Sequence, residues 1–320
     1  MMSAHADWAD AAEQASGGRD RRDCEPECRR CTACNFLQPI DDGMSSHVTD
    51  ADCVCFLKWC LPQLGLHWEG FRRVRKQVCK RLQRRLSDLG LEDLSTYRSY
   101  LSQHGQEWAV LDSLCTITIS RFYRDRVVFD ALRAEILPAL ARKAAANDVA
   151  ALRCWSAGCS SGEEPYTLQI IWTLCVQPAI AEAIRLQIIA TDVDDTLLER
   201  ARRGWYSRSS LRDLPAPLVE QAFDRSDGLY CIRSAFRAGL QFLRQDIRAE
   251  VPAGPFDLVL CRNLALTYFE NSVQRQVLER VLAQLLPGGY IIVGRNESLP
   301  ASIADVRQHK GVPGIYEKVR

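Results

Sequence analysis

Hydrophobic residues over 51–130 recur at the three- and four-residue spacing of amphipathic helices. One apolar stripe is formed by Leu82, Leu86, Leu89 and Leu91, and Gly90 is placed to end that helix in a left-handed conformation. The same spacing continues through Leu94, Tyr97, Leu101, Trp108, Leu111 and Leu114. The pattern predicts a small all-helical N-terminal domain over 51–130.

From residue 131 onward, short apolar runs typical of buried strands alternate with helical segments. Strands are predicted at 151–155, 186–192, 256–261 and 290–293. Helices are predicted at 130–144, 165–176, 195–203 and through 277–285, the last ended by Pro-Gly-Gly at 287–289. Such alternation is typical of an α/β layer fold with a mostly parallel sheet. We therefore expect one α/β domain over 131–320.

The composition is that of an ordinary globular protein, with 47% hydrophobic and 25% charged residues among 320. The 41 basic side chains nearly balance the 40 acidic ones, so no global charge directs the chain to nucleic acid or to a membrane surface. The first residues lack the basic and apolar segments of a signal peptide, and the most apolar stretch, 168–181, is too short to span a bilayer. We expect a cytoplasmic protein that does not insert into membranes.

Residues 1–50 are polar and show no helical or strand period, which predicts a flexible, cysteine-rich leader. Its closely spaced thiols are Cys24, Cys28, Cys31 and Cys34. Four thiols at this spacing can bind one zinc ion or an iron–sulfur cluster, and an unliganded, redox-labile segment is the alternative. Without an export signal, the 14 cysteines of the chain are expected to be mostly reduced, with Cys79 among those buried as small hydrophobic side chains.

The turn after the first predicted strand contains Gly158 and Gly162, followed by Glu163 and Glu164. In a parallel sheet this turn lies at the carboxyl ends of the strands, where such folds bind ligands. Two carboxylates at a helix N-terminus disfavour a phosphate and favour a cationic group such as an ammonium or a sulfonium. Asp192 ends the next predicted strand, where an acid can bind both hydroxyls of a ribose. The alternative is structural: the glutamates stabilise the helix dipole and Asp192 caps a helix.

The five histidines stand at positions 5, 47, 67, 104 and 309, so the stretch from 131 to 308 contains none. Hydrolase triads that use a histidine base are therefore excluded within that stretch. A reaction at the predicted turn has to proceed without an imidazole base.

Residues 155–166, Trp-Ser-Ala-Gly-Cys-Ser-Ser-Gly-Glu-Glu-Pro-Tyr, closely resemble the S-adenosylmethionine-binding motif of CheR-type chemotaxis receptor methyltransferases. Further family motifs are resembled by 120–125, 190–194, 256–263 and 286–289, so the resemblance covers roughly 60–300. It implies a Rossmann-like class I methyltransferase domain with a small helical N-terminal domain and a short β-subdomain, here about 225–240.

Members of this family transfer the methyl group of S-adenosylmethionine to glutamate side chains on receptor helices, which forms methyl esters. The resemblance implies this activity here. A glutamate with a pKa of about 4.3 is ionised at pH 7, so the acceptor needs no general base. Alignment in a water-poor site then supplies most of the catalysis. Two alternatives stay open: a CheR-like enzyme that methylates a small molecule or a non-receptor protein, and a non-catalytic regulator that binds S-adenosylmethionine or S-adenosylhomocysteine.

The resemblance implies a cofactor site composed of Thr118, Ser120, Arg124, Ala157, Glu163, Asp192, Asp246, Ile247, Arg262 and Asn263. Glu163 would bind the methionine amino group and Asp192 the ribose. Asp246, where the family usually has Asn, would lie near the adenine. Arg124 and Tyr268 are the implied catalytic residues, and Arg124 would orient the substrate carboxylate with its planar guanidinium. A structural salt bridge from Arg124, to Asp125 or to the sheet, is the alternative.

The chain departs from the family's pattern in three places. One additional residue separates Asn263 from Tyr268, and we expect Tyr268 to reach the active site through a bulge. Arg295 and Asn296 stand where a small-residue or histidine pair is common. The stretch 225–237 is short where members that tether to a receptor's tail peptide carry a longer β-subdomain, so no tail-pentapeptide tether is expected.

The predicted helix over 71–85 is strongly basic, and no acid occurs between 70 and 86. Its charges are Arg72, Arg73, Arg75, Lys76, Lys80, Arg81, Arg84 and Arg85. In the family this helix is thought to face the acidic methylation region of receptors, where charge complementarity would speed encounter and fix orientation. No aromatic residue interleaves the charges for base stacking, so an acidic helical protein, a receptor signalling domain, is the expected partner rather than nucleic acid. A merely solvated basic face is the alternative.

Overall fold

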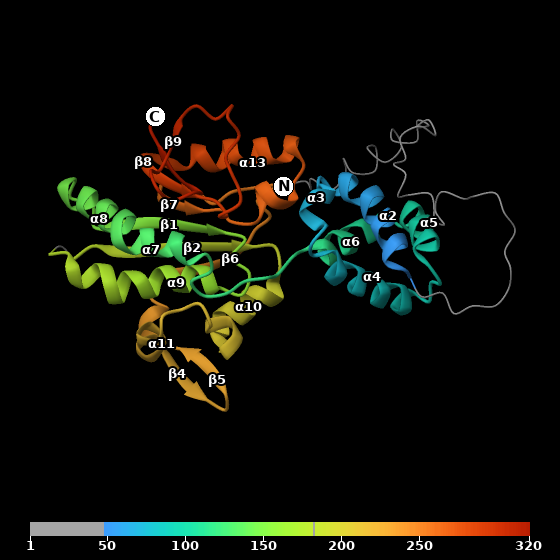
Figure 1. The fold of residues 1–320 in the computed structure, drawn as a ribbon, viewed down its shortest axis with the longest axis horizontal. Coiled ribbons are helices and arrows are strands. Elements are labelled where there is room, and N and C mark those ends of the chain that lie inside the picture. Colours follow the sequence, from blue (N-terminus) through green and yellow to red (C-terminus); the bar gives the residue numbers. More distant parts are fainter. Residues whose placement is uncertain (1–47, 182) are drawn as a thin grey trace, which may run out of the picture. The chain divides into compact units, whose positions relative to one another are not determined.

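The computed structural model describes residues 48–181 and 183–320. The chain divides into two compact units, one ending at Ile117 and the other extending from Thr118 to Arg320 (Figure 1). The segment 118–130, which the sequence analysis assigned to the helical domain, lies in the second unit. The metal site predicted at Cys24, Cys28, Cys31 and Cys34 lies outside the described residues.

The described part of the first unit is helical. Its α-helices are α2 (Asp50–Cys60), α3 (Trp68–Phe71), α4 (Arg75–Leu89), α5 (Leu94–Gln103) and α6 (Glu107–Cys115). Thr49 caps α2 in a reciprocal pair with Asp52, and Gly90 ends α4 at φ 65°, as its sequence position predicts. The predicted apolar stripe on α4 supplies Leu82 and Leu86 to the core of this unit.

A disulfide bond joins Cys53 of α2 to Cys79 of α4, with the two Cα atoms 5.9 Å apart. The expectation that Cys79 is a reduced, buried thiol is therefore wrong. Sequence spacing gave no signal for this bond, because the partner lies 26 residues away on a different helix. Eight cysteines among the described residues are free thiols.

The second unit contains a seven-stranded sheet in the order β6-β2-β1-β7-β8-β10-β9 (Figure 1). The strands are β1 (Ala151–Ala157), β2 (Arg185–Asp192), β6 (Leu240–Arg244), β7 (Phe256–Leu260), β8 (Leu285–Ile292), β9 (Val306–Gln308) and β10 (Ile315–Lys318). Neighbouring strands from β6 to β8 are parallel, whereas β10 is antiparallel to both of its neighbours. The predicted Rossmann-like α/β fold is confirmed.

The order of the strands reverses direction at the centre of this sheet. The chain runs outward from β1 to β2 and β6, and then returns to the other side of β1 with β7. In open α/β sheets, ligands bind outside the carboxyl ends of the strands at such a switch point. The topology therefore locates a candidate site between the ends of β1 and β7.

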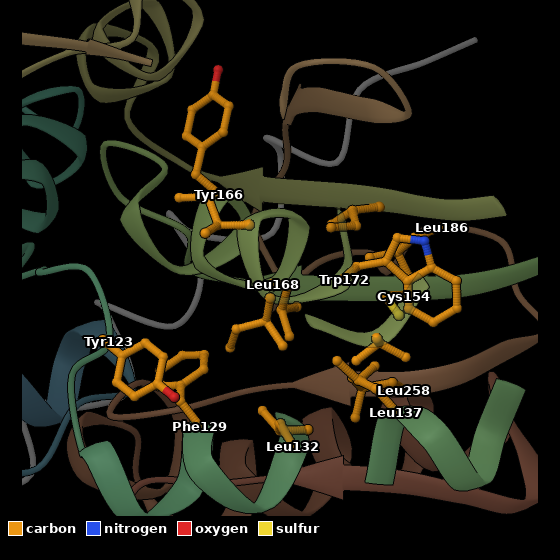
Figure 2. Packing of buried hydrophobic residues seen from close by; sticks show 14 of the residues in the cluster. Tyr123, Phe129, Leu132, Leu137, Cys154, Tyr166, Leu168, Trp172, Leu186 and Leu258 are labelled. Atoms are coloured by element: carbon orange, nitrogen blue, oxygen red, sulfur yellow. The ribbon is translucent and has the colours of Figure 1, made fainter. Parts of the chain in front are cut away.

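Helices cover the sheet and supply its hydrophobic core. They include α7 (Arg126–Ala131), α8 (Leu137–Ala146), α9 (Glu163–Ile171), α10 (Asp195–Arg203) and α13 (Asn271–Ala283). Figure 2 shows part of the core, with Phe129, Leu132 and Leu137 near Cys154 of β1, Leu258 of β7 and Leu168 and Trp172 of the α9 segment. The predicted helix over 130–144 corresponds to a longer helical run from α7 through a π-helical turn (Leu132–Ile136) into α8.

A second sheet of three antiparallel strands, in the order β3-β5-β4, lies outside the main one. It consists of β3 (Trp205–Ser207), β4 (Phe223–Ser226) and β5 (Leu229–Ile232), with α11 (Ala216–Ala222) before β4. This β-subdomain begins earlier in the chain than the predicted 225–240. The reason is that β3 joins it by pairing with β5, and residue 240 already belongs to the main sheet.

Within the described ranges, no helix combines the length and apolar character needed to cross a bilayer.

Candidate active site

The carboxyl ends of four parallel strands bring most of the predicted site residues to one edge of the main sheet. Ala157 is the last residue of β1 and pairs with Thr191 of β2. Asp192 follows Thr191 directly and is the last residue of β2. Arg262 follows β7 by two residues, and Glu297 follows the end of β8 by five. Segments far apart in sequence therefore converge where the topology locates a ligand site.

The glycine turn after β1 is fixed against β2 by backbone hydrogen bonds. The N–H groups of Gly158 and Cys159 donate to the carbonyl of Thr191, at 2.8 and 2.9 Å. Gly162 ends the turn at φ 87°, and a Cβ there would lie 2.8 Å from the Cβ of Ala201. Position 162 therefore requires glycine both for its conformation and for close packing on α10.

Glu163 begins α9 with its carboxylate almost fully enclosed, at 2% exposure. The Ser161 hydroxyl donates to its two carboxylate oxygens at 2.9 and 3.0 Å, and its own backbone N–H and the Ser120 hydroxyl also favour its charged form. Burial raises the pKa of Glu163 above its usual value, against the hydrogen bonds that favour its charged form. A buried carboxylate held by hydroxyls rather than by a cation is a suitable partner for a ligand ammonium.

Asp192 is also buried and is oriented by backbone donors. Its Oδ2 accepts from the N–H of Ser160 at 2.7 Å, and its Oδ1 accepts from the N–H of Asp194 at 3.0 Å. Burial raises the pKa of Asp192 above the usual value. The two bonds fix the carboxylate at the end of β2, with lone pairs remaining for further donors.

Two polar atoms close to Asp192 in the fold are buried without a hydrogen-bond partner. They are Oγ of Ser160, whose N–H binds the Asp192 carboxylate, and Oε1 of Gln245, whose N–H donates to the Asp192 carbonyl at 3.0 Å. Buried polar groups are rarely left unpaired, so these atoms indicate a polar ligand at this edge of the sheet. A nucleoside with its ribose and base fits that requirement.

Asp246 and Ile247 follow β6 by two and three residues. The carboxylate of Asp246 forms a close ion pair with Arg248, whose Nη2 donates to Oδ2 at 2.8 Å. Ile247 is buried. Arg248 neutralises the charge that Asp introduces where the family usually has Asn.

Arg262 is almost fully buried and is bound to protein groups. Its Nη1 donates to Oε2 of Glu164 at 2.9 Å, and its Nη2 donates to Oδ2 of Asp125 at 2.6 Å and to the carbonyl of Arg124 at 2.8 Å. The sequence analysis placed Arg262 along the cofactor. Its Nη2 binds the segment that carries Arg124, and its Nη1 binds Glu164 of α9.

Arg124 and Tyr268, the two residues predicted to be catalytic, lie near enough for the charge of Arg124 to act on the Tyr268 hydroxyl. Burial raises the pKa of Tyr268, the positive charge of Arg124 opposes this rise, and Glu297 adds to it. Arg124 donates from Nη1 to the carbonyl of Ile119 at 2.7 Å. Across the described part of the chain it forms no ion pair with a carboxylate, because the neighbouring Asp125 is bound by Arg262. The alternative of a structural Arg124–Asp125 salt bridge is therefore wrong.

Tyr268 is the last residue of a short helix, α12 (Ala265–Tyr268). Asn263, at φ 53°, begins the turn into this helix, so the additional residue before Tyr268 lies in a helical turn rather than in a strand bulge. Glu297 binds the segment that leads into α12: its carboxylate accepts from the N–H of Asn263 at 2.9 Å and from the hydroxyl of Thr267.

The sequence analysis missed four residues at this site: Ser160, Glu164 as a partner of Arg262, Gln245 and Glu297. Ser160 and Glu164 were within the quoted motif, and their polarity next to glycines was the available signal. Gln245 and Glu297 are single polar residues beyond strand ends. Their importance depends on contacts with segments more than 30 residues away.

The strand order, with a single reversed strand between β8 and β9, defines a class I S-adenosylmethionine-dependent methyltransferase fold. Residues 118–313 match the family described as "CheR methyltransferase, SAM binding domain". The chain belongs to the CheR methyltransferase family, and its second unit is a methyltransferase domain that binds S-adenosylmethionine.

Curated relatives are similar along most of the chain. "Chemotaxis protein methyltransferase 2" of Vibrio cholerae is 31% identical over 278 residues, which cover 84% of this chain and 94% of the relative. "Chemotaxis protein methyltransferase" of Escherichia coli is 32% identical, with 70% and 77% covered. "Chemotaxis protein methyltransferase 1" of Pseudomonas aeruginosa is 31% identical, with 76% and 89% covered.

Proposed function

We propose that this enzyme transfers a methyl group from S-adenosylmethionine to glutamate side chains of chemotaxis receptors, forming methyl esters. The observation that carries this proposal is Arg124, a guanidinium beside Tyr268 with no carboxylate partner among the described residues. An unpaired guanidinium at the chemistry is suited to a substrate that brings its own carboxylate. The names of the curated relatives support receptors as the source of that carboxylate.

The residues at the strand ends fit S-adenosylmethionine. Glu163 would bind the methionine ammonium, with Ala157, Thr118 and Ser120 beside it, and Asp192 would bind the ribose hydroxyls. Asp246, Ile247 and Asn263 complete the proposed cofactor site. The unpartnered atoms of Ser160 and Gln245 provide two further polar contacts for a nucleoside.

When bound, S-adenosylmethionine supplies a methyl group on a positively charged sulfur, which leaves as a neutral thioether once a carboxylate oxygen has taken the methyl. The substrate glutamate is ionised at neutral pH, so no residue of this chain has to remove a proton. Arg124 would orient the carboxylate through two parallel N–H donors, and Tyr268 would close the site beside it. A mechanism without a general base agrees with the lack of histidine between 131 and 308.

The partner surface proposed on α4 is narrower than the basic sequence suggests. Four of the basic side chains have partners within the first unit. Three form ion pairs: Arg72 with Glu69, Arg75 with Asp50, and Arg85 with Glu107. The fourth, Arg81, donates to the carbonyl of Leu114 at 3.0 Å. The four that stay exposed without such partners are Arg73, Lys76, Lys80 and Arg84. We call these four residues the basic face.

Arg73 lies in the turn before α4, and Lys76, Lys80 and Arg84 follow at the four-residue spacing of one side of that helix. Such a stripe complements an acidic receptor helix, and we propose that it docks the substrate without a tail-peptide tether. The metal prediction for Cys24, Cys28, Cys31 and Cys34 stays a prediction, and metal analysis of the purified chain with and without residues 1–50 tests it.

The function is tested by label transfer from methyl-tritiated S-adenosylmethionine to a purified receptor signalling domain, followed by mild alkali to release methyl esters as volatile methanol. Alkali-labile label is expected with the wild-type enzyme, and a large decrease to a residual rate with Arg124→Ala. Arg142→Ala, an exposed arginine on α8, is the matched control and should behave as wild type.

Calorimetric titration with S-adenosylhomocysteine separates binding from chemistry in the same variants. Label that appears only on other proteins of a whole lysate would replace the receptor with another acceptor. Binding without alkali-labile label on any protein would overturn the enzymatic proposal.

A further inference from the structure

Arg124 stands between two residues with left-handed backbone. Tyr123 has φ 58° and Asp125 has φ 64°, and neither is glycine. Such conformations are unfavourable for residues with a Cβ and persist only where the surrounding structure enforces them. The direction of the Arg124 side chain therefore depends on whatever holds its two neighbours.

The preceding residue is held by the protein core. Tyr123 is completely buried, its ring lies 5.3 Å from that of Phe129, and both rings are visible side by side in Figure 2. Its hydroxyl donates to Asp130 at 2.9 Å, and its N–H donates to the hydroxyl of Thr167 at 3.1 Å. These contacts fix one end of the turn independently of any ligand.

The following residue is held by a single side chain, Arg262. The guanidinium of Arg262 binds both the Asp125 carboxylate and the Arg124 carbonyl, at 2.6 and 2.8 Å, from the same nitrogen. Its charged group also lies 5.1 Å from the centre of the Phe129 ring, and its side chain is only 3% exposed. Arg262 thus binds the backbone of the catalytic residue as well as its neighbour.

Arg262 is itself oriented from the opposite side. Its Nη1 donates to Glu164 of α9, and the other oxygen of Glu164 accepts from the hydroxyl of Ser156 in β1 at 2.8 Å. The chain of contacts runs from the central strand through α9 and the β7 loop to the Arg124 turn. A charge-assisted chain of this length, enclosed by protein, has one geometry rather than several.

The same contacts determine which charge stays available for the substrate. Asp125 is the carboxylate nearest to Arg124 in the sequence, and Arg262 neutralises it. Without that pairing, Asp125 would compete with a substrate carboxylate for the Arg124 guanidinium.

We infer that Arg262, oriented by Glu164 and acting on Asp125, is a positioning residue that aims Arg124 at the acceptor carboxylate. This inference rests on the proposed function for the role of Arg124. It assigns Arg262 to the substrate side of the reaction, whereas a cofactor-lining role would make it contribute to S-adenosylhomocysteine affinity.

The test is a double-mutant cycle with Arg262→Lys and Arg124→Ala, measured as kcat and KM for methyl transfer to the receptor domain. Lysine keeps the charge but lacks the planar set of donors that reaches two partners. We expect Arg262→Lys to lower kcat/KM by about 10- to 100-fold, as misplacement of a catalytic group does. In the Arg124→Ala background its effect should fall to within about twofold, since the residue through which it acts is gone.

Two binding measurements separate positioning from a structural or cofactor role. The affinity of each variant for S-adenosylhomocysteine, by calorimetry, should stay within about twofold of wild type. Asp125→Gly guards against misfolding of the arginine variant, because glycine adopts the left-handed turn freely while it loses the Arg262 contact. It should keep its melting temperature and still lose kcat/KM.

Amide hydrogen exchange provides a readout that needs no acceptor. In full-length enzyme with S-adenosylhomocysteine, Arg262→Lys and Asp125→Gly should both accelerate exchange over 119–126 relative to wild type. Unchanged exchange there, an equal effect of Arg262→Lys in both backgrounds, or a parallel loss of S-adenosylhomocysteine affinity would each overturn the inference. If the wild type itself leaves no alkali-labile label on receptor, the proposed function fails and the exchange result alone decides the positioning inference.

Discussion

Under the proposed function, the buried carboxylate of Glu163 serves binding at the expense of stability. Burial raises its pKa, so the folded protein holds the Glu163 proton more tightly than the unfolded chain does. The contribution of this group to stability therefore declines as pH rises from the ordinary carboxylate pKa through the raised one.

Replacing Glu163 with Gln is expected to stabilise the ligand-free enzyme at pH 7 by about 1 kcal/mol, because it removes a carboxylate whose charged form is disfavoured by burial. The same change should weaken S-adenosylhomocysteine binding by at least about tenfold, since the ammonium loses its counter-charge. Denaturant unfolding and calorimetry measure the two effects. Glu220→Gln, an exposed glutamate on α11, should change neither, and a destabilised Glu163→Gln would contradict the argument.

The pH dependence of cofactor binding is expected to report on the same group. As pH falls through the raised pKa of Glu163, the carboxylate gains a proton and affinity for S-adenosylhomocysteine should decrease. The decrease should begin at a higher pH than for an ordinary glutamate. Calorimetric titrations across the acid range measure it, and in Glu163→Gln this portion of the pH profile should be flat.

Sequence could predict some of these residues and not others. Glu163 and Asp192 were predicted because each follows directly from a strand end and a turn, which are local features, whereas Ala157 was implied by the family resemblance. The partners of Arg262 could not be identified, since Asp125 and Glu164 lie 137 and 98 residues away from it. Only folding brings such groups together, and no local pattern records it.

At the scale of elements, α4 combines a structural side with the proposed docking side. Arg85 is anchored by Glu107, which also accepts from the hydroxyl of the buried Tyr97 at 2.7 Å, so α4, α5 and α6 are bound together. Periodicity predicted the helix and its apolar stripe. Which bases were internal depended on acids in other helices, and the sequence of α4 alone could not distinguish them.

Reversing the charge of the basic face should therefore act on the substrate alone. The variant with Arg73, Lys76, Lys80 and Arg84 all changed to Glu is expected to raise KM for the receptor domain by about tenfold or more. Its S-adenosylhomocysteine affinity and its kcat should stay near wild type. Arg142→Glu with Arg275→Glu, two exposed sites on α8 and α13, is the control, and an equal rise in KM there would refute a specific docking face.

The disulfide between α2 and α4 is expected to stabilise the first unit. It closes a loop of 26 residues, which in the chain-entropy account contributes about 3 kcal/mol. Cys53→Ser with Cys79→Ser should lower stability by about that amount under non-reducing conditions. Reductant should lower the stability of wild type but not that of the double variant, and chemical denaturation with and without dithiothreitol measures this.

Strand β8 shows how proline and glycine residues can lead to a wrong prediction of an element. Pro287, Gly288 and Gly289 predicted the end of a helix, whereas the structure has β8 beginning at Leu285 and passing through all three residues. The pairing of β7 with β8 shifts register across them, so the proline and glycines occupy an irregular part of the ladder. Proline and glycine residues indicate that a regular element is interrupted, but they do not show whether that element is a helix or a strand.

At the scale of the whole molecule, the net charge is close to zero although one patch of the surface is strongly basic. The formal net charge is +1, while the basic face places four exposed cations on α4 and the turn that precedes it. Attraction to an acidic partner is therefore local and should be sensitive to screening, which acts over about 10 Å at 0.1 M salt.

We expect kcat/KM for the receptor domain to fall several-fold as ionic strength rises from about 0.05 to 0.5 M, because steering by surface charge is screened. The affinity for S-adenosylhomocysteine, held by buried groups, should change much less. Initial rates at subsaturating receptor measure the first quantity. The charge-reversed basic face should abolish or invert this salt dependence, and an unaltered dependence would argue against electrostatic steering by α4.

The long separation between Asp125 and Arg262 has a consequence for how the enzyme is made. At about 5–20 residues per second, the ribosome needs roughly 7–27 s to add the 137 residues between them. Glu163 and Asp192 are added during that interval, but throughout it Asp125 lacks Arg262 as a partner, and Glu297 emerges later still. A nascent chain stalled before residue 262 is therefore expected to retain strands β1 and β2 without an oriented acceptor site. Methylation competence thus arises late in synthesis, when the β7 loop docks on a turn made more than a hundred residues earlier.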